Sequence, residues 1–489
     1  MLNTSLLRKF ASIRLTENEA KVFASLLEAS EALGKSTVLR AAGGWVRDKL
    51  MGFESCDIDI ALDNIPGDEF ALFVHEREQK RGNCSGIGIV KENPLQSKHI
   101  RTASFRFHGL DLDVNNLRSE SYTEDSRIPE VKFASHPSED ALRRDFTVNA
   151  LYYNLNTEQV EDFTGTGLAD LDAHVIRTPL PAKQTFIDDP LRVLRAIRFS
   201  TRFGFRLDGE IVEAWKDEAV QAGLSSKVSR ERIGIEIGKM MHHPTGAPEA
   251  VYLLYSSSLI RLILPPPSDA RVVSLTGVSK KDYTAWLEAW APSTERVGNL
   301  VDPSVLTSRL VLPPAFPFEQ RSHLYFSVLF FETIWQKRNP NPLLVARLAM
   351  KLSNKDCKLI AAVLMAIEPM QAVMKSRSVV ELGRLIRNSV KENFPSAILL
   401  AILSARDVDS SEILSRFDEM MELVTSNHLQ DCADWKPVVD GLEIQTVFKL
   451  KPGKVIQDLL TFQFDLMCLG ERDKTVLMQK IGTYLEHSS

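Results

Sequence analysis

The 489-residue sequence lacks the features of several protein classes. No apolar run reaches the roughly 18 residues that a helix needs to cross a bilayer, so we expect no membrane association. Cysteine is scarce, and no two cysteines form a CxxC pair. The five cysteines are Cys56, Cys84, Cys357, Cys432 and Cys468. An odd number at scattered positions argues against a disulfide framework or a zinc site and indicates a reducing compartment.

The chain also lacks a general excess of positive charge. Its formal net charge is −5 at pH 7, which excludes a uniformly basic coat for nucleic acid. A local basic stripe remains compatible with this value, because phosphate binding depends on where the charges lie. Hydrophobic residues at 44% and charged residues at 25% are typical of globular proteins. At roughly 150 residues per domain, the length predicts about three modules.

The first sixteen residues, MLNTSLLRKFASIRLT, contain three basic residues and no acidic one. This composition is typical of a short mitochondrial presequence, and it is equally typical of a basic first helix. Both interpretations stay open.

Secondary-structure signals change along the chain. Short alternating runs between residues 38 and 117 predict strands: TVLRAAGGWV, CDIDIAL and LDLDVNNL. A helix is predicted to begin at Ser138 and to run through ALRRDFTVNALYY. After Gly165 and Gly167 helical periodicity dominates, with proline-rich interruptions at 264–270 and 313–317. The sequence therefore predicts an α+β fold, in which a small α/β head precedes a long helical remainder.

Carboxylates follow the second predicted strand. Side chains alternate across a strand, so Asp57 and Asp59 project from one face. The run GLDLDVNN can bring Asp113 beside them, with Asp111 as a same-face neighbour. Clustered acids repel one another unless a cation neutralises them, and hard oxygen ligands suit Mg²⁺. Two such ions could activate a hydroxyl and stabilise a leaving pyrophosphate. The alternative is a solvated edge strand.

A glycine pair lies thirteen residues upstream of these acids, in the run GGWVRD. Gly43 and Gly44 at a strand end would let a phosphate approach backbone N–H groups closely. We place both glycines, with Arg47 of the same run, among the candidate nucleotide-binding residues. The alternative is a simple turn.

These motifs, together with ALRRDFTVNAL and DDPLRVLRAIRF, resemble the class II tRNA nucleotidyltransferases, the CCA-adding enzymes, and their bacterial poly(A) polymerase relatives. The resemblance covers roughly residues 36 to 240. The stretch NLRSESYTEDSRIPEVKF is similar to the eukaryotic CCA-adding branch, where a flexible loop follows the third carboxylate strand. The resemblance implies a nucleotidyltransferase head (1–160), a helical neck with the nucleotide-selecting motif (161–245), a helical body (246–375) and a tRNA-binding helical tail (376–489).

The resemblance also implies roles for individual residues. Asp57 and Asp59 would bind the catalytic metals, and Asp113 would be the third catalytic acid, although DVNN replaces the more usual DFVN. The RRD motif would contact the phosphates and ribose of the incoming nucleotide, and it corresponds to Arg143, Arg144 and Asp145. Two guanidiniums offer forked donors to phosphate, and a carboxylate can accept from a ribose hydroxyl.

The run DDPLRVLRAIRF places Asp189 and Arg192 three residues apart on one helix face. This acceptor and donor match the pairing edges of cytosine and adenine and oppose those of uracil and guanine. In the family this motif takes the part of a template, and its first acid, usually Glu, is Asp188 here. Arg195 and Arg198 join the nucleotide-binding candidates. The alternative is that Asp189 merely caps its own helix.

Three later segments have weaker assignments. DFTGTGLADL (162–171) resembles a hinge, although its glycines could simply be left-handed turn residues. SRERIGIEIGKMM (229–241) is expected to be a packed helix with Glu231 and Arg232 as stabilising partners. Candidate RNA contacts are Arg202, Lys451 and Lys454; the alternative for the two lysines is a solvated turn.

The sequence as a whole predicts an enzyme that builds CCA on the 3′ end of tRNA from CTP and ATP with Mg²⁺. We expect a monomer in the cytoplasm, the nucleus or the mitochondrion. A poly(A) polymerase and a catalytically inert tRNA-binding protein are the alternatives.

Overall fold

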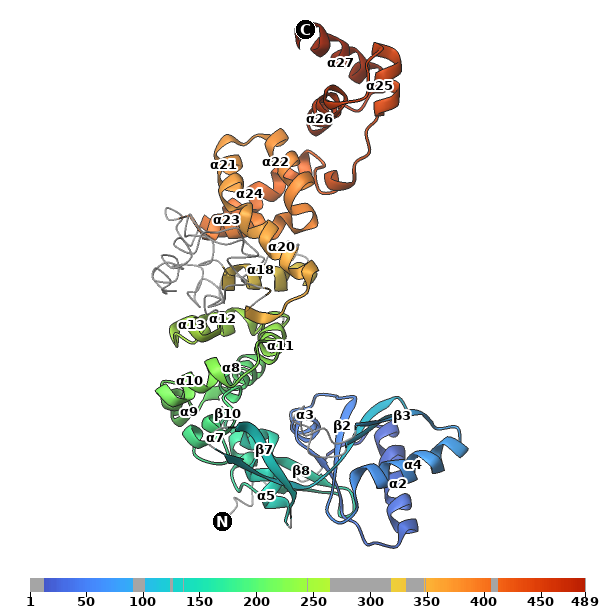
Figure 1. The fold of residues 1–489 in the computed structure, drawn as a ribbon, viewed down its shortest axis with the longest axis vertical. Coiled ribbons are helices and arrows are strands. Elements are labelled where there is room, and N and C mark those ends of the chain that lie inside the picture. Colours follow the sequence, from blue (N-terminus) through green and yellow to red (C-terminus); the bar gives the residue numbers. More distant parts are fainter. Residues whose placement is uncertain are drawn as a thin grey trace. The chain divides into compact units, whose positions relative to one another are not determined.

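The computed structural model describes residues 13–90, 102–123, 126–134, 136–243, 245–263, 318–330, 347, 349–405 and 412–488. Most of the predicted basic N-terminal segment and both predicted proline-rich interruptions lie outside these residues. The chain forms two compact units, residues 1–232 and 233–489 (Figure 1). The four-part division into head, neck, body and tail is finer than this and remains a prediction.

The first unit is built on a seven-stranded sheet in the order β3-β4-β5-β2-β1-β8-β9. Its strands are β1 (Leu39–Ala42), β2 (Asp57–Leu62), β3 (Cys84–Val90), β4 (Thr102–Phe107), β5 (Leu110–Asn116), β8 (Leu151–Asn154) and β9 (Gln159–Asp162). Strands β2 and β5 pair in parallel, and every other neighbouring pair in this sheet is antiparallel. The central parallel pair contains all the predicted catalytic acids.

One face of the sheet is apolar and supports a helix. Ile58 and Ile60 on β2 and Leu112 and Val114 on β5 are buried, as strict alternation requires. Helix α4 (Gly67–Lys80) packs against β3, β4 and β5, and α2 (Glu17–Leu33) packs against α4 (Figure 1). Because this face is buried, the acids must project from the opposite face of the strands. A shift of the strand register by one residue would exchange the two faces and bury the acids.

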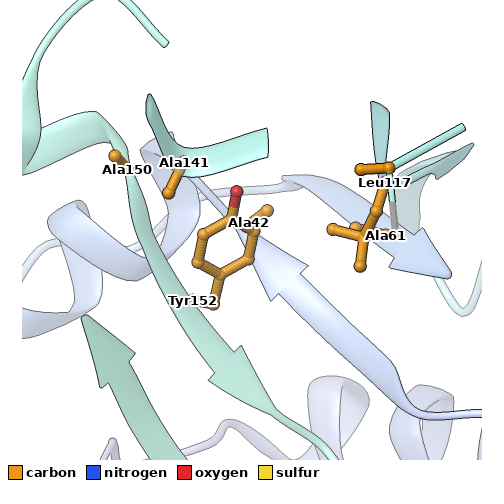
Figure 2. Packing of buried hydrophobic residues seen from close by; sticks show 7 residues of the cluster. Ala42, Ala61, Leu117, Ala141, Ala150 and Tyr152 are labelled. Atoms are coloured by element: carbon orange, nitrogen blue, oxygen red, sulfur yellow. The ribbon is translucent and has the colours of Figure 1, made fainter. Parts of the chain in front are cut away.

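The opposite face combines the acids with a patch of small side chains. A buried cluster there comprises Ala42, Ala61, Leu117, Ala134, Ala141, Ala150 and Tyr152 (Figure 2). The short helix α5 (Pro137–Leu142) contributes Ala141, and the hydroxyl of Tyr152 points toward this helix (Figure 2). Alanines on both the strands and the helix let the backbones approach closely. The end of α5 is therefore held beside the acidic part of the same face.

The predicted helix from Ser138 through Tyr153 is wrong beyond its first turns. Helix α5 ends at Leu142, a 3₁₀ turn follows at Thr147–Asn149, and the run LYYN forms strand β8 beside β1. All four residues of β8 are buried. Tyrosines and a leucine in a fully buried run fit a central strand well, and tertiary pairing overrides the local helical pattern.

The segment predicted as a flexible loop after β5 is an antiparallel ribbon. It consists of β6 (Arg118–Thr123) and β7 (Ser126–Phe133). Its base is tied to the sheet by backbone bonds from Leu117 N–H to the Leu62 carbonyl and from Ala134 N–H to the Leu117 carbonyl.

The remainder of the first unit is helical, as predicted, apart from the two-residue parallel strands β10 (Val175–Ile176) and β11 (Arg206–Leu207). Its helices are α6 (Gly167–Asp172), α7 (Ala182–Asp188), α8 (Arg192–Phe203), α9 (Gly209–Ala214), α10 (Glu218–Ser226) and the start of α11 (Arg230–Met241). Helix α8 ends at Gly204 in the left-handed conformation, a common helix stop. The segment predicted as a packed helix at 229–241 is α11.

The described part of the second unit is helical throughout. Its helices include α12 (Ala247–Ser256), α13 (Ile260–Ile263), α18 (Phe318–Phe330), α20 (Asn354–Met365), α21 (Ile367–Ser376), α22 (Val379–Leu385), α23 (Phe394–Leu403), α24 (Ile413–Ser426), α25 (Gly441–Phe448), α26 (Lys454–Cys468) and α27 (Lys474–Ser488). Helix α23 is buried on all sides. The α+β prediction is confirmed. Among the described residues, no single helix is long and apolar enough to span a membrane. The helices α20 and α21, which are bent relative to each other, would together be long and apolar enough, by length and composition only.

Candidate active site

The predicted carboxylates meet in one row across the sheet. Asp59 on β2 is the direct partner of Asp113 on β5, and Asp57 is the partner of Asp111. The row continues through Ser104 on β4, whose hydroxyl donates a hydrogen bond to Asp113. Directly paired residues project on the same face. The structure therefore brings Asp57, Asp59 and Asp113 together, as predicted.

The pKa values of Asp57 and Asp59 are both raised, chiefly by burial and further by the neighbouring carboxylates. Partial burial, with Asp113 and Asp111 nearby, raises the pKa of Asp57. Burial also raises the pKa of Asp59 to about 6; Asp113 and Asp57 add to the increase, and Arg144 and Arg118 oppose it. Both side chains still reach solvent, so the surrounding protein reduces their hydration without closing the site. Such repulsion is what a divalent cation relieves.

The donor set fits Mg²⁺ in kind. Among the described residues, no three His, Cys, Asp or Glu side chains are close enough together to hold an ion by themselves. Mg²⁺ is usually held by one or two carboxylates, with substrate phosphates and water completing its six ligands. Asp57 and Asp59 are the residues that would hold it.

The glycine pair lies at the start of α3 (Gly44–Leu50), with Gly43 as the N-cap and Gly44 as the first helical residue. Gly43 has φ 72°, which favours glycine, and a Cβ there would lie 2.8 Å from Nη1 of Arg144. The absent side chain leaves room for that guanidinium. Arg47, predicted to bind nucleotide, is buried; it donates to Asp48 Oδ1 and Asn149 Oδ1, and its guanidinium lies 4.5 Å from the Phe203 ring centroid. These contacts join α3 to α8.

The arginines of the RRD motif share one buried carboxylate, Asp140. Arg143 donates to Asp140 Oδ1 and to the Arg118 carbonyl, and Arg144 donates to Asp140 Oδ2 and to the Tyr152 hydroxyl. Sequence reasoning missed Asp140. The sequence did contain one signal, the spacing of Asp140. It lies three residues before Arg143 and four before Arg144, and residues at these spacings share one face of a helix.

Asp145, the third residue of the motif, pairs with α8. Its Oδ2 accepts from Arg195 Nε at 2.8 Å, and its Oδ1 accepts from the Phe146 N–H and from Asn149. The Asp145 side chain is buried, and Arg195 and its other donors hold the pKa of its carboxyl at about 2. Because both carboxylate oxygens are engaged, these contacts link the segment between α5 and the 3₁₀ turn to α8. The predicted contact with ribose is untested.

The two predicted base-reading residues are held by different elements. Asp189 Oδ2 accepts from Nη2 of Arg232 on α11 at 2.8 Å, and its Oδ1 accepts a longer bond from the Leu191 N–H at 3.3 Å. Asp189 thus bonds the turn before α8, as the cap alternative proposed, and it also has an ionic partner. Arg192 donates to the Arg143 carbonyl at 2.7 Å. Sequence reasoning treated Arg232 as scaffold, and no sequence signal linked it to Asp189.

The remaining arginines of α8 pack on aromatic rings. The guanidinium of Arg198 lies 4.0 Å from the Phe199 ring centroid, and that of Arg202 lies 4.9 Å from the Phe203 centroid. Arg198 is buried, whereas Arg202 is partly exposed and 4.0 Å from an Asp48 oxygen. Cation–π contacts of this kind order the basic face of the helix.

The predicted hinge at 162–171 is a hydrogen-bonded turn. Asp162 accepts bonds from the backbone N–H groups of Thr164, Gly165 and Leu168. Gly165 has φ 77° and matches the turn alternative. Gly167 is required for packing instead, because a Cβ there would lie 2.8 Å from the Thr147 carbonyl oxygen. Rotation about this segment remains a prediction.

The predicted RNA-contacting lysines of the second unit lie at the start of α26. Lys451 and Lys454 are exposed and flank Pro452 and Gly453. Their position leaves both ammonium groups open to solvent.

Comparisons with known proteins agree with this site. A family model described as the poly A polymerase head domain matches residues 39–177, which include the acid row, the glycine turn and the RRD motif. Fold and site together define a nucleotidyltransferase. The mitochondrial CCA tRNA nucleotidyltransferase of Saccharomyces cerevisiae is 35% identical over 477 residues, a match that covers 87% of this chain and 85% of the yeast protein. The chain belongs to the CCA tRNA nucleotidyltransferase family and is an enzyme of that class, as predicted.

Solved structures share the fold along nearly the whole chain. The Thermotoga maritima CCA-adding enzyme complexed with tRNA superposes with a TM-score of 0.64 at 18% identity, covering 99% of this chain and 98% of the other. The Bacillus stearothermophilus CCA-adding enzyme in complex with CTP has a TM-score of 0.60 at 19% identity, with 97% and 100% covered. At such identities the likeness concerns the fold.

Proposed function

We propose that this enzyme adds C, C and A in turn to the 3′ end of tRNA from CTP and ATP, and that its own side chains replace a nucleic-acid template. The observation that carries the proposal is the β2–β5 register, which places Asp59 beside Asp113. Family membership and the nearby arginines of the RRD motif support the same chemistry.

The acid row would hold the catalytic metal ions. Asp57 and Asp59 are the proposed ligands of Mg²⁺, and Asp113, oriented by Ser104, completes the acidic face. When bound, paired Mg²⁺ ions would lower the pKa of the tRNA 3′-hydroxyl and stabilise negative charge on the leaving pyrophosphate. The hydroxyl oxygen forms a bond to the α-phosphorus, its proton leaves, and pyrophosphate departs with the electron pair of the broken bond.

The triphosphate would lie between the glycine turn and the RRD arginines. Arg144 lies beside Gly43 and is close enough to Asp59 to lower the pKa of that carboxyl. Guanidiniums are well suited to the oxygens of a phosphate chain. Arg143 and Arg144 would therefore bind the nucleotide next to the metal ligands.

Asp189 and Arg192 would read the base. Asp189 is held as an acceptor by Arg232, and a guanidinium has five N–H donors, so the bond from Arg192 to the Arg143 carbonyl leaves others for a ligand. Cytosine and adenine each present an amino donor beside a ring-nitrogen acceptor, and both match this pair. Uracil and guanine would oppose donor to donor and acceptor to acceptor.

The partners and the location follow from the same proposal. We propose that the 3′ end of tRNA is the substrate, that Arg202, Lys451 and Lys454 contact its backbone, and that the enzyme acts as a monomer. The name of the yeast relative supports a mitochondrial location for this chain; the cytoplasm and the nucleus are further proposed locations.

A single assay tests the function. The full chain is incubated with Mg²⁺, labelled CTP and ATP, and tRNAs that end before, within and after the CCA sequence. We expect additions that complete CCA and then stop. A long ladder of A residues would instead identify a poly(A) polymerase, and no product from any tRNA would identify an inert RNA-binding protein.

A further inference from the structure

Asp140 forms the densest hydrogen-bond network around the proposed nucleotide site. Its Oδ1 accepts from the Arg118 N–H at 3.1 Å and from Nε and Nη2 of Arg143. Its Oδ2 accepts from Nε and Nη2 of Arg144, at 3.1 and 3.0 Å, and from the Tyr152 hydroxyl. Six donors exceed the roughly four lone-pair sites of a carboxylate. Asp140 is 1% exposed, so it is enclosed by its partners and has no capacity left for a substrate.

The partners of Asp140 are the groups that would meet the triphosphate. Arg143 and Arg144 follow directly after α5, which ends at Leu142. Two adjacent guanidiniums repel each other, and the negative charge of the shared carboxylate offsets this repulsion. Each arginine donates two hydrogen bonds to Asp140, and these bonds fix the orientation of both guanidinium planes. The two arginines hold the pKa of Asp140 well below its usual range. The carboxylate therefore remains ionised at neutral pH.

The network also connects the arginines to the acid row. Arg144 donates to the Asn149 carbonyl at 3.3 Å, lies over the Tyr152 ring and occupies the space that Gly43 leaves open. Tyr152 pairs with Ala42, and Ala42 pairs with Asp59 on the neighbouring strand. The chain of contacts thus runs from Asp140 through Tyr152 and the sheet to the proposed metal ligand.

We propose that Asp140 is a positioning residue for nucleotidyl transfer, which sets the place of the nucleotide's triphosphate by holding Arg143 and Arg144 in fixed orientations. This inference rests on the proposed function. Asp140 does not touch the substrate and acts only through the two arginines. The hydrogen-bond partners that orient metal ligands, which act in a comparable way, typically contribute about 10- to 100-fold to affinity or activity.

The test compares Asp140→Asn, Asp140→Glu and Tyr152→Phe in the full chain. Steady-state kinetics with a tRNA that lacks CCA give kcat and the KM for CTP, and inhibition by inorganic tripolyphosphate gives an inhibition constant that depends on the triphosphate site alone. For Asp140→Asn we expect the KM for CTP and the tripolyphosphate constant to rise together, about tenfold or more, with the KM for tRNA unchanged. Asp140→Glu should restore part of the loss.

A matched control separates positioning from folding. Asp170 is also buried and bonded, to Thr147 and Arg177, but it has no bond to the RRD arginines. Asp170→Asn should lower the thermal midpoint without raising either constant. If Asp140→Asn lowers only the midpoint or kcat and leaves both constants at the wild-type values, the inference is wrong.

Two further outcomes have defined meanings. If Asp140→Asn does not fold, the Tyr152→Phe variant provides the test, because it removes one hydrogen bond to Asp140 and changes no charge. We expect the KM for CTP and the tripolyphosphate inhibition constant each to rise about threefold. Unchanged values of both would overturn the inference. Wild-type protein that incorporates no CMP refutes the proposed function. An active wild type with an unaffected Asp140→Asn variant refutes only the role of Asp140.

Discussion

Arg232 on α11 donates a hydrogen bond of 2.8 Å to Asp189, which lies 43 residues earlier in the chain. A helix cap has no need of such a partner. The ion pair orients the Asp189 carboxylate, as a base-reading acceptor would require. Arg192 is held separately, by the Arg143 carbonyl.

Loss of either proposed base-reading residue, Asp189 or Arg192, should relax nucleotide selection. Asp189→Ala and Arg192→Ala are each expected to reduce the preference for CTP over UTP, by roughly 5- to 150-fold for a lost contact of about 1–3 kcal/mol. Incorporation of each of the four nucleotides into tRNA measures this preference. Asp217 is a suitable control because it caps α10 through the Ala219 N–H; Asp217→Ala should lower stability only. Unchanged selectivity in the Asp189 variant would return that residue to the role of a cap.

Loss of Asp59 should abolish chemistry and spare tRNA binding. Metal-bound catalysis supplies several kcal/mol, so Asp59→Ala is expected to reduce the rate of CMP incorporation by roughly a thousandfold. A filter-binding measurement should give an unchanged Kd for tRNA. The exposed Asp172 at the end of α6 provides the control, and Asp172→Ala should keep full activity. Substantial turnover by Asp59→Ala would contradict the metal assignment.

Two glycines with positive φ help to separate backbone strain from displacement of a neighbour. Gly43 and Gly165 have φ of 72° and 77°, so alanine at either position should lower stability. Only at Gly43 would the new Cβ meet Arg144, whereas Gly165 has nothing within 4 Å. Gly43→Ala should therefore also raise the KM for CTP. Equal kinetics in the two variants would show that the space beside Gly43 does not matter for nucleotide binding.

The Asp145–Arg195 ion pair should make stability depend on pH. Folding lowers the pKa of Asp145 to about 2, below the value near 4 of an unfolded chain. The resulting stabilisation, on the order of 2 kcal/mol, is complete above about pH 4 and is lost as the pH falls toward 2. Urea unfolding of wild type and Asp145→Asn between pH 6 and pH 3 measures the contribution. The difference between the two proteins should shrink as the pH falls; a constant difference would argue against the pair.

The exposed Lys451 and Lys454 at the start of α26 should contribute to tRNA affinity through their charge. The double variant Lys451→Glu, Lys454→Glu is expected to raise the Kd for tRNA several-fold and to reduce its salt dependence by about one to two ion equivalents. The KM for CTP should not change. A control with Lys21→Glu on α2, which is exposed and paired with Glu17, should leave the Kd unaltered. An unchanged Kd in the double variant would remove this surface from the RNA contact.

Alternation and motif spacing predicted the members of the acid row but not the register that aligns them. Asp57 and Asp59 share a face because side-chain direction repeats every two residues, and Asp113 joins them through the parallel register. The sequence pattern contained no information on that register, which depends on contacts between strands. Local periodicity failed at Leu151–Asn154, where a buried central position requires a strand.

Long-range partners were also beyond sequence reasoning. From the sequence alone, Asp140 is an ordinary acidic residue in the first turn of a helix. Arg232 is expected only to stabilise the helix in which it lies. Their importance follows from contacts with Tyr152 and Asp189, which are 12 and 43 residues away. Arg47, predicted to bind nucleotide, also joins α3 to α8 in the protein interior, and this second part was not predicted.

The alanine cluster under α5 has a consequence for natural variation. The distance between α5 and the sheet is set by small side chains, those of Ala42, Ala61 and Ala141. A larger side chain at one of these positions would displace the end of α5 and, with it, the guanidinium groups of Arg143 and Arg144. Replacement of one of these alanines by a bulkier neutral residue would therefore impair the enzyme while leaving every ionisable group intact. Inherited or evolved substitutions of this kind would exchange one neutral apolar residue for another and would therefore seem conservative. They would still impair catalysis, through the changed spacing between the backbones of the helix and the sheet.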